Sequence, residues 1–454
     1  MKLNKQRTIL IGFAFMSICA FWQFYDNEIP KILKYTFNLG ETWTGVVMAL
    51  DNVLALFLLP LFGTISDKTD TGFGKRMPYI LVGTALSAVL LTILIIIARP
   101  SGNLALFVGV LLLLLLSMGI YRSPAVSLMP DLTPAPFRST ANAIINLMGT
   151  LGGIYILVMI KVLLKEAADP AQTDYIPLML SLVLFMIVAV AVVFFTINEK
   201  KIKEEIKKDG GLKSLGETFD NNAEDASSND EKASDGEMIS KSGMTQKATA
   251  MPSEIKRSLI FLLVSVFLWF TAYNAVTTAF SRFVAEVWDL HDNAYATCLL
   301  VATIAATLSY VPIAFVSSKI GRKKTILIGI SLMAASYVIT GLYPHFSPSI
   351  NIFFALVGIG WASINVNSYP MVVEMSKAGD IGKYTGTYYT FSMAAQVFTP
   401  IFSGFLLENI SYRTLFPYAF IFSALAFVTM LMVKHGDVKP PKKEKLIDHF
   451  DVDD

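Results

Sequence analysis

Two charged residues lie deep inside apolar runs of this sequence, and they are the first candidates for chemistry. Asp51 lies near the middle of the run 43–65, and Arg122 lies near the end of the run 103–126. A charge near the centre of a bilayer costs roughly 2.5–3.5 kcal/mol on insertion scales, so both side chains are expected to face a protein interior or water. A carboxylate there can exchange a proton with water. A structural ion pair is the alternative, and for Arg122 so is a side chain that snorkels to the membrane surface.

Amide and aromatic side chains recur in other apolar runs, at spacings that place them on one helix face. Asn142 and Asn146 lie one turn apart, and four polar residues between 385 and 396 follow an i, i+4, i+7, i+11 pattern. Because amides bond hydroxyl groups and an aromatic ring can stack on a pyranose face, the set predicts a polar, ring-shaped ligand. Core packing is the alternative for any single aromatic residue. The candidate ligand residues are Gln23, Asn27, Arg122, Asn142, Asn146, Trp361, Asn365, Tyr389 and Gln396.

The elements that must position these side chains are long apolar runs, which predict membrane-spanning helices. Apolar residues make up 54% of the 454 residues and charged residues only 16%, too few to cover a water-soluble surface. A helix needs roughly 20 mainly apolar residues to cross about 30 Å of hydrocarbon, and the runs lack the alternation of barrel strands. We therefore predict an all-α polytopic membrane protein with twelve transmembrane helices in two pseudo-symmetric six-helix bundles. The predicted spans are 8–34, 43–65, 78–98, 103–126, 140–164, 176–197, 257–281, 294–317, 324–343, 350–373, 384–407 and 412–433.

The distribution of Lys and Arg predicts the orientation of these spans. With the N-terminus inside, most basic residues fall in cytoplasmic segments and few fall on the opposite side. We therefore expect a multi-pass protein of the plasma membrane with both termini in the cytoplasm. The first apolar run exceeds roughly 20 residues and lacks a small-residue cleavage site, so we interpret it as an uncleaved span.

Residues 198–256 differ from the rest of the chain in composition. They include one aromatic residue, Phe219, and are rich in Lys, Glu, Asp, Ser and Gly. Such a segment cannot bury enough apolar surface to order itself, and a short helix at its start is the only order expected. A regulatory domain is the alternative. The predicted organisation is a six-helix bundle at 1–197, a cytoplasmic and mostly disordered linker at 198–256, a second bundle at 257–434 and a cytoplasmic tail at 435–454.

The two halves also repeat each other weakly. The segments PLFGTISDKTDTGFGKRMPY and PIAFVSSKIGRKKT, after spans 2 and 8, both join a proline to a short polar turn with Gly and clustered Lys or Arg. The segments after spans 4 and 10 place Asp131 or Glu374 before Arg138 or Lys383. Weak internal symmetry of this kind is typical of duplicated transporter halves.

Several other function classes are disfavoured by the sequence. A net charge of +2 is too small to indicate a nucleic-acid partner. All four histidines lie in predicted loops or the tail, without metal-ligand spacing, and no Walker motif is present. We therefore expect no metal, no cofactor, no catalytic residues and no ATP-driven reaction, and we do not expect an enzyme. Cys19 and Cys298 lie in separate apolar runs and are interpreted as core residues.

The segment GTISDKTDTGFGKRMPYI, residues 63–80, resembles the signature loop of the major facilitator superfamily. Its five-residue expansion and trailing Pro-Tyr-Ile resemble the glycoside–pentoside–hexuronide:cation symporters, especially their sucrose/proton symporter branch. The passage PAVSLMPDLT…STANAIINLMGTLGG is similar to that branch, and the likeness covers essentially the whole chain. Two features depart from it. Val126 stands where the sucrose branch carries an arginine, and Ala55 and Leu59 replace the acids of a sodium site, which favours protons.

The resemblance implies a gate at this segment. In such transporters the loop latches the halves together on the cytoplasmic side and releases them when the protein opens inward. A positive-inside anchor without a gating role is the alternative. The second loop has Ser318 near the place of the acid, so we expect it to anchor only. The gate residues implied are Gly63, Asp67, Lys75, Arg76, Asp131 and Arg138.

The resemblance also implies a function and a major facilitator fold. We expect a secondary active transporter, a monomer in the lipid bilayer, that imports a sugar (a disaccharide or other glycoside) together with a proton. Asp51 is the expected coupling residue, with Asp26 as the alternate. An exporter or antiporter of another metabolite or drug on the same fold is the competing hypothesis, and polar cavity residues are what discriminate between the two.

Overall fold

The computed structural model describes residues 3–99, 101–134, 137–165, 169–210, 252–290, 293–375 and 381–437. Within these ranges the regular secondary structure is helical, and twelve helices are long and apolar enough to cross a membrane. The predicted all-α fold with twelve spans is therefore confirmed. Residues 211–251 of the predicted linker and 438–454 of the predicted tail lie outside the described residues.

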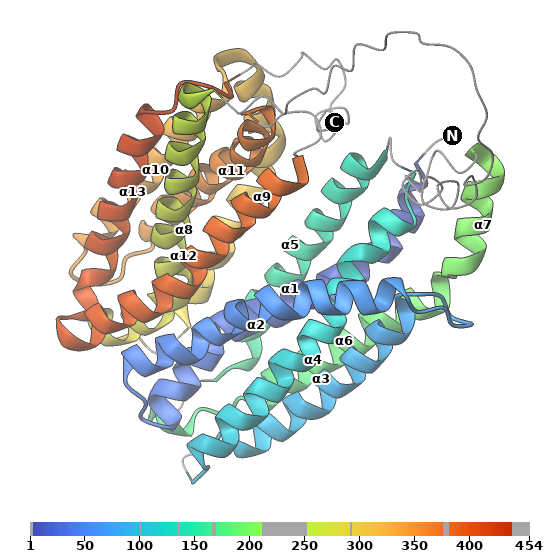
Figure 1. Ribbon diagram of the computed structural model, residues 1–454. Coiled ribbons are helices and arrows are strands. Elements are labelled where there is room, and N and C mark those ends of the chain that lie inside the picture. Colours follow the sequence, from blue (N-terminus) through green and yellow to red (C-terminus); the bar gives the residue numbers. More distant parts are fainter. Residues whose placement is uncertain are drawn as a thin grey trace, which may run out of the picture.

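The spans fall into two sets of six, which we call the N-terminal and C-terminal halves (Figure 1). The N-terminal half contains α1 (Lys5–Lys31), extended by η1 (Ile32–Thr36), then α2 (Glu41–Asp67), α3 (Met77–Ile97), α4 (Leu104–Asp131), α5 (Arg138–Leu163), η3 (Pro170–Gln172) and α6 (Ile176–Thr196). The C-terminal half contains α8 (Ser253–Trp288), α9 (Ala294–Ile320), α10 (Arg322–Gly341), α11 (Ile350–Met375), α12 (Ile381–Asn409), η5 (Tyr412–Thr414) and α13 (Leu415–Leu431). The short helix α7 (Glu199–Gly210) follows the first half.

Local capping sets several helix starts. The side chain of Asn4 accepts the N–H of Arg7 at 3.0 Å, and that of Asn103 accepts the N–H of Leu106 at 3.2 Å. Such caps satisfy backbone donors that have no partner within the helix. Helix α8 begins at Ser253 rather than at the predicted 257, because its first turns are polar and extend beyond the apolar run. The start of the predicted linker is helical as α7.

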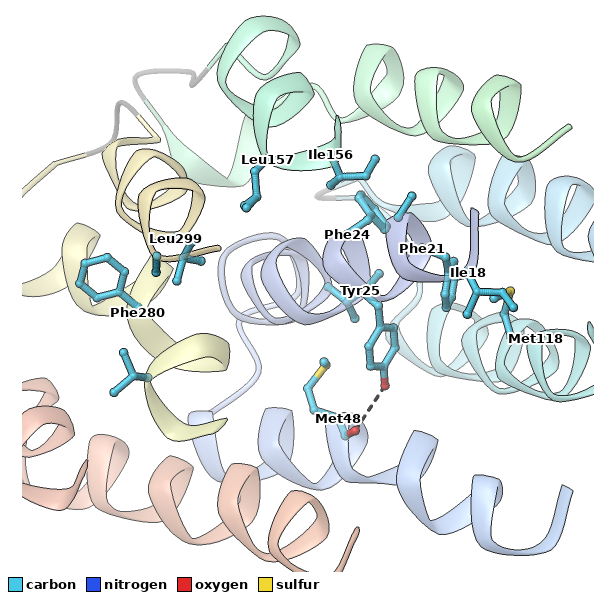
Figure 2. Packing of buried hydrophobic residues seen from close by; sticks show 14 of the residues in the cluster. Ile18, Phe21, Phe24, Tyr25, Met48, Met118, Ile156, Leu157, Phe280 and Leu299 are labelled. Atoms are coloured by element: carbon cyan, nitrogen blue, oxygen red, sulfur yellow. Dashed lines mark hydrogen bonds between the residues drawn. The ribbon is translucent and has the colours of Figure 1, made fainter. Parts of the chain in front are cut away.

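Helix α1 is the centre of the N-terminal half and packs on α4, α5 and α6. Figure 2 shows its side chains Phe21, Phe24 and Tyr25 in the packed interior, and the Tyr25 hydroxyl donates to the backbone oxygen of Met48 on α2 at 3.4 Å. In the C-terminal half α11 packs on α9 and α10, and α8 packs on α13. The buried apolar side chains of the two halves join in one continuous cluster, which runs from Ile11 to Val433.

The most extensive contacts between the halves, among the described residues, are those of α2 with α12, α5 with α9, and α1 with α8. We call the side of the molecule at which α1 begins and α13 ends the terminal side, and the other the opposite side (Figure 1). The α2–α12 contact is close on the opposite side: a Cβ added at Gly45 would lie 2.0 Å from the Pro400 backbone oxygen. The ribbons of the two halves diverge toward the terminal side (Figure 1).

Candidate functional site

Three charged side chains of the N-terminal half come together in the interior. Arg122 on α4 interacts electrostatically with Asp26 on α1 and Asp51 on α2, and the two carboxylates interact with each other. All three residues are half-buried. The Asn52 side chain donates to the Asp51 carboxylate at 2.7 Å, and the Arg122 guanidinium lies 5.3 Å from the centre of the Trp22 ring. We call Asp26, Asp51 and Arg122 the central charge group.

The central charge group does not balance its own charge. It holds two carboxylates and one guanidinium, so with both acids ionised it carries one negative charge in excess. Low-dielectric surroundings make such an excess costly unless a proton, a cation or a ligand donor compensates for it. The arrangement is therefore able to take up one positive charge.

An aromatic pair of the C-terminal half faces this group. Tyr273 on α8 and Trp361 on α11 stack with ring centres 3.8 Å apart at 3°, and Phe270 packs edge-on against Trp361 at 5.1 Å. Tyr273 also interacts electrostatically with Asp26, which brings the aromatic pair near the charged group of the other half. Since Tyr273 covers one face of Trp361, the ring predicted to meet a ligand is already stacked on one side.

The predicted amides mainly bond to their own helices. Asn27 donates to the Gln23 carbonyl at 2.7 Å, Asn365 to the Trp361 carbonyl at 3.2 Å, and Gln396 to the Ser392 carbonyl four residues earlier at 3.3 Å. These bonds use one donor each and leave the amide oxygens for other partners.

Three other predicted ligand residues are exposed. Asn142 and Asn146 lie on α5, and Tyr389 on α12 is 55% exposed beside the rings of Tyr369 and Tyr388. Of the predicted site, the structure thus assembles Asp26, Asp51 and Arg122, with Trp361 linked to them through Tyr273.

Two buried donors escaped the sequence analysis as site residues. The indole N–H of Trp22 and the side-chain amide nitrogen of Asn274 have no hydrogen-bond partner among the residues that the structure describes. A buried donor without a hydrogen bond costs about 1–3 kcal/mol, so these two groups are candidates to bond to a bound ligand. The signals in the sequence are the polar stretch around Trp22 in the first span and the polar residues Tyr273 and Asn274 in the seventh. Within the same described residues, no group of three or more His, Cys, Asp and Glu side chains is placed to hold a metal ion.

On the terminal side, Arg76 joins the ends of two helices. Its guanidinium bonds to Asp67 and Ser66 at the end of α2, to the Gly63 carbonyl at 3.2 Å, and to Asp131 at the end of α4 at 2.8 Å. Burial alone would lower the pKa of Arg76, but the hydrogen bonds and charges of Asp131 and Asp67 raise it above its ordinary value. The arginine therefore stays charged. These partners all lie in the N-terminal half.

Two further contacts involve the predicted gate residues. Asp67 forms an ion pair with Arg76, and Arg138 donates to the nearby Thr133 carbonyl at 3.3 Å. In the second half, Arg322 forms an ion pair with Glu374 at the end of α11. Both residues lie in the C-terminal half, so this ion pair does not join the two halves.

On the opposite side, charged residues connect the two halves. The Arg282 guanidinium on α8 donates to both carboxylate oxygens of Glu41 on α2, at 2.9 and 3.1 Å, and both side chains are nearly buried. Lys34 lies 2.6 Å from Glu286 and 3.5 Å from Glu41. Tyr412 donates to Glu41 at 2.5 Å.

A second part of this network lies where α1 meets α9. Buried Glu28 accepts a hydrogen bond from the Tyr295 hydroxyl and lies 3.4 Å from Lys31. Asn293 accepts from Lys31 at 3.4 Å and donates to the Leu164 carbonyl at 2.9 Å. We call Glu28, Lys31, Lys34, Glu41, Arg282 and Glu286 the cross-half ionic cluster; its three acids balance its three bases.

The sequence pattern does not mark these residues as functional. Lys31, Lys34 and Arg282 are among the few basic residues that the predicted orientation places on the outer side. The available signal was that acids sit at the same depth, near the outer ends of spans 1, 2 and 7. A basic residue retained where the positive-inside rule disfavours it is a candidate for a specific ion pair.

Comparison with known families gives a broad match. A family model described as Major Facilitator Superfamily matches residues 9–309 and 262–450. Two uncharacterized MFS-type transporters from two strains of Mycobacterium tuberculosis are each 25% identical over 206 residues, which is 44% of this chain and 29% of the relative. The match therefore spans less than a third of the length of these curated relatives.

Solved transporter structures share the fold. The nucleoside transporter NupG aligns with a TM-score of 0.64 at 16% identity, covering 95% of this chain and 100% of that one. The xylose transporter XylE from E. coli, in an inward open conformation, aligns at 0.63 and 14% identity, covering 98% of both chains. A POT family transporter in complex with 5-aminolevulinic acid aligns at 0.66 and 13% identity, covering 94% of this chain and 95% of that one. At these identities the likeness establishes the fold alone.

Proposed function

The chain belongs to the Major Facilitator Superfamily and is thus a multi-pass membrane transporter rather than an enzyme, and on that premise we propose that it imports a sugar together with a proton. The substrate we propose is a disaccharide or another glycoside. The observation that carries the proposal is the central charge group, with its one uncompensated carboxylate beside the aromatic pair Tyr273 and Trp361. Solved structures of this fold include a nucleoside, a peptide and a xylose transporter, so the fold does not determine the substrate.

The coupling ion is proposed from the charge balance. A proton on Asp51 or Asp26 would leave one carboxylate for Arg122 and make the group neutral. The neutral group is cheaper to close off from water, so the loaded transporter can change its conformation while the unprotonated one is held back. A proton moving down the membrane potential supplies roughly 2.3 kcal/mol per 100 mV, enough for about a fiftyfold sugar gradient.

The substrate class is proposed from the partners that the site offers. The stacked rings of Tyr273 and Trp361 can pack on an apolar sugar face. The unused donors of Trp22 and Asn274, with the guanidinium of Arg122, can bond hydroxyl groups. A purely apolar drug would leave these donors unbonded, at a cost of about 1–3 kcal/mol each, which disfavours such a drug as the substrate.

Alternating access is proposed to run between the two sides of the molecule. The cross-half ionic cluster joins the halves on the opposite side, whereas the contacts of Arg76 stay within the N-terminal half. With the terminal side in the cytoplasm, as the Lys and Arg distribution favours, this arrangement corresponds to a transporter closed to the outside. The gate proposed at Gly63, Asp67, Lys75, Arg76, Asp131 and Arg138 would then be in its released state.

The test is transport by the purified protein in proteoliposomes. We expect labelled disaccharide to exchange against unlabelled disaccharide, and an inward proton gradient to drive its accumulation with alkalinisation of the outer medium. Accumulation that continues after the pH gradient and the membrane potential are both abolished would exclude proton coupling. A proton signal of the opposite sign would indicate the antiporter instead. No counterflow with any of a panel of glycosides would remove the sugar assignment.

A further inference from the structure

The carboxylate of Glu199 holds the loop that carries Arg76. Glu199 is the first residue of α7, and it is only 1% exposed. Its oxygens accept the backbone N–H groups of Lys75 at 2.7 Å, Arg76 at 3.0 Å and Met77 at 2.9 Å. These groups begin α3, whose own cap residue supplies no side-chain bond. An anionic side chain at a helix start satisfies free donors and is favoured by the helix dipole.

The backbone at this point is shaped around that carboxylate. Gly74 has φ of +108°, and a Cβ added to it would lie 2.3 Å from a carboxylate oxygen of Glu199. A residue with a side chain at position 74 would be strained by the positive φ and would collide with the Glu199 carboxylate. Since Arg76 is fixed through its backbone by Glu199 and through its side chain by Asp67 and Asp131, one residue links α7 with the ends of α2 and α4.

Helix α7 is itself anchored on the N-terminal half. Ile202 and Ile206 are buried in the apolar core, and Lys200 lies 3.1 Å from Asp70 in the same loop. The position of Glu199 is therefore set by packing, and a displacement of α7 would move the Arg76 backbone with it.

The second half repeats this arrangement. Asp437 follows the last span, as Glu199 follows the sixth, and it accepts the backbone N–H of Lys323 at the start of α10 at 2.8 Å. Gly321 has φ of +96°, and a Cβ added to it would lie 3.1 Å from Asp437. The neighbouring Arg322 pairs with Glu374, as Arg76 pairs with Asp131. Two copies of one arrangement point to a role beyond a chance contact.

We propose that Glu199 and Asp437 are positioning residues of the two terminal-side loops. Each ties the segment that leaves the last span of its half to the loop that bears the arginine. Each thereby holds the arginine in register with the acid of span 4 or span 10 (Asp131 or Glu374). We call the hydrogen bonds from the backbone of each loop to Glu199 or Asp437 the clamp. The effect of the clamp on transport rests on the proposed gate, whereas the existence of the clamp does not.

The clamp is tested by hydrogen exchange on the full-length protein in lipid nanodiscs. In Glu199→Gln, one of the two accepting oxygens becomes an NH2 donor and the negative charge at the helix start is lost. The amides of residues 75–77 should therefore exchange at least about tenfold faster. Exchange at 63–67 and 131–134 should rise as well, because Arg76 loses its fixed position. Glu204→Gln, at an exposed site on the same helix, should leave all three regions unchanged. Asp437→Asn should affect the start of α10 and spare residues 75–77.

The transport readout separates positioning from general stability. For Glu199→Gln we expect the maximal transport rate to fall about tenfold while KM stays within about twofold and the thermal midpoint is little changed. Unchanged exchange at residues 75–77 in Glu199→Gln would overturn the clamp. Faster exchange there with a wild-type transport rate would overturn its role in the gate. Neither exchange result depends on which solute is carried. A failure of the sugar assignment can therefore be told apart from a failure of the clamp.

Discussion

Arg282 and Glu41 lie 241 positions apart in the chain and on different halves, yet both carboxylate oxygens of Glu41 accept from one guanidinium nitrogen. Both side chains are nearly buried, so neither charge is hydrated when the halves meet. A buried pair of this kind adds little net stability, because desolvation offsets the attraction, but the loss of one partner costs about 3–5 kcal/mol. The main effect of the pair is therefore to determine which surfaces of the two halves meet. It adds little to the stability of their contact.

The first prediction concerns the sign of this pair. Glu41→Arg and Arg282→Glu should each reduce transport at least about tenfold, because each places two like charges in the closed interface. The double variant restores opposite signs and should recover transport to within about threefold of the wild type. Uptake and thermal unfolding of all four proteins check this. A double variant as inactive as the single variants would show that the pair is not a closing contact.

The second prediction distinguishes the two carboxylates. Asp51→Asn should abolish uphill accumulation while counterflow continues, because an amide cannot exchange the coupling proton. Asp26→Asn should retain some accumulation if Asp51 is the proton carrier. Asp174→Asn, at an exposed loop position, serves as the control. Full accumulation by Asp51→Asn, with loss in Asp26→Asn, would transfer the role to Asp26.

The third prediction concerns the approach of α2 to α12. Gly45→Val should prevent the halves from meeting on the opposite side, since even a Cβ would lie 2.0 Å from the Pro400 backbone oxygen. Transport should fall at least about tenfold, with greater cysteine labelling on the opposite side. Gly386→Ala, where an added Cβ meets nothing within 4 Å, should behave like the wild type. Equal labelling in Gly45→Val and the wild type would contradict this.

The fourth prediction tests the aromatic pair. Tyr273→Ala and Trp361→Ala should each raise the sugar KM by about five- to thirtyfold, corresponding to the loss of roughly 1–2 kcal/mol of ring contact. Trp43→Ala removes a ring that is 64% exposed and should leave KM unchanged. Concentration series of initial uptake rates provide the comparison. An unaltered KM in both site variants would place the ligand elsewhere.

The spans were predictable because each depends on the local run of residues. In the bilayer, backbone N–H and C=O groups find no water, so a long apolar run must satisfy them within itself. A helix does this whatever its neighbours are. Asp51 and Arg122 were identified by the same reasoning, since a charge within such a run needs a polar partner. Their grouping with Asp26 was not predictable, because it depends on how α1, α2 and α4 pack.

The sequence by itself determined that this chain spans the membrane twelve times and which residues are costly to bury, since hydropathy acts over one helix length. Only the tertiary structure decided which charges meet. Glu41 with Arg282, and Glu199 with the backbone at Arg76, are pairs between distant segments, and their partners follow from helix packing. Charge is a property of a residue, whereas an ion pair is a property of two helices and the distance between them.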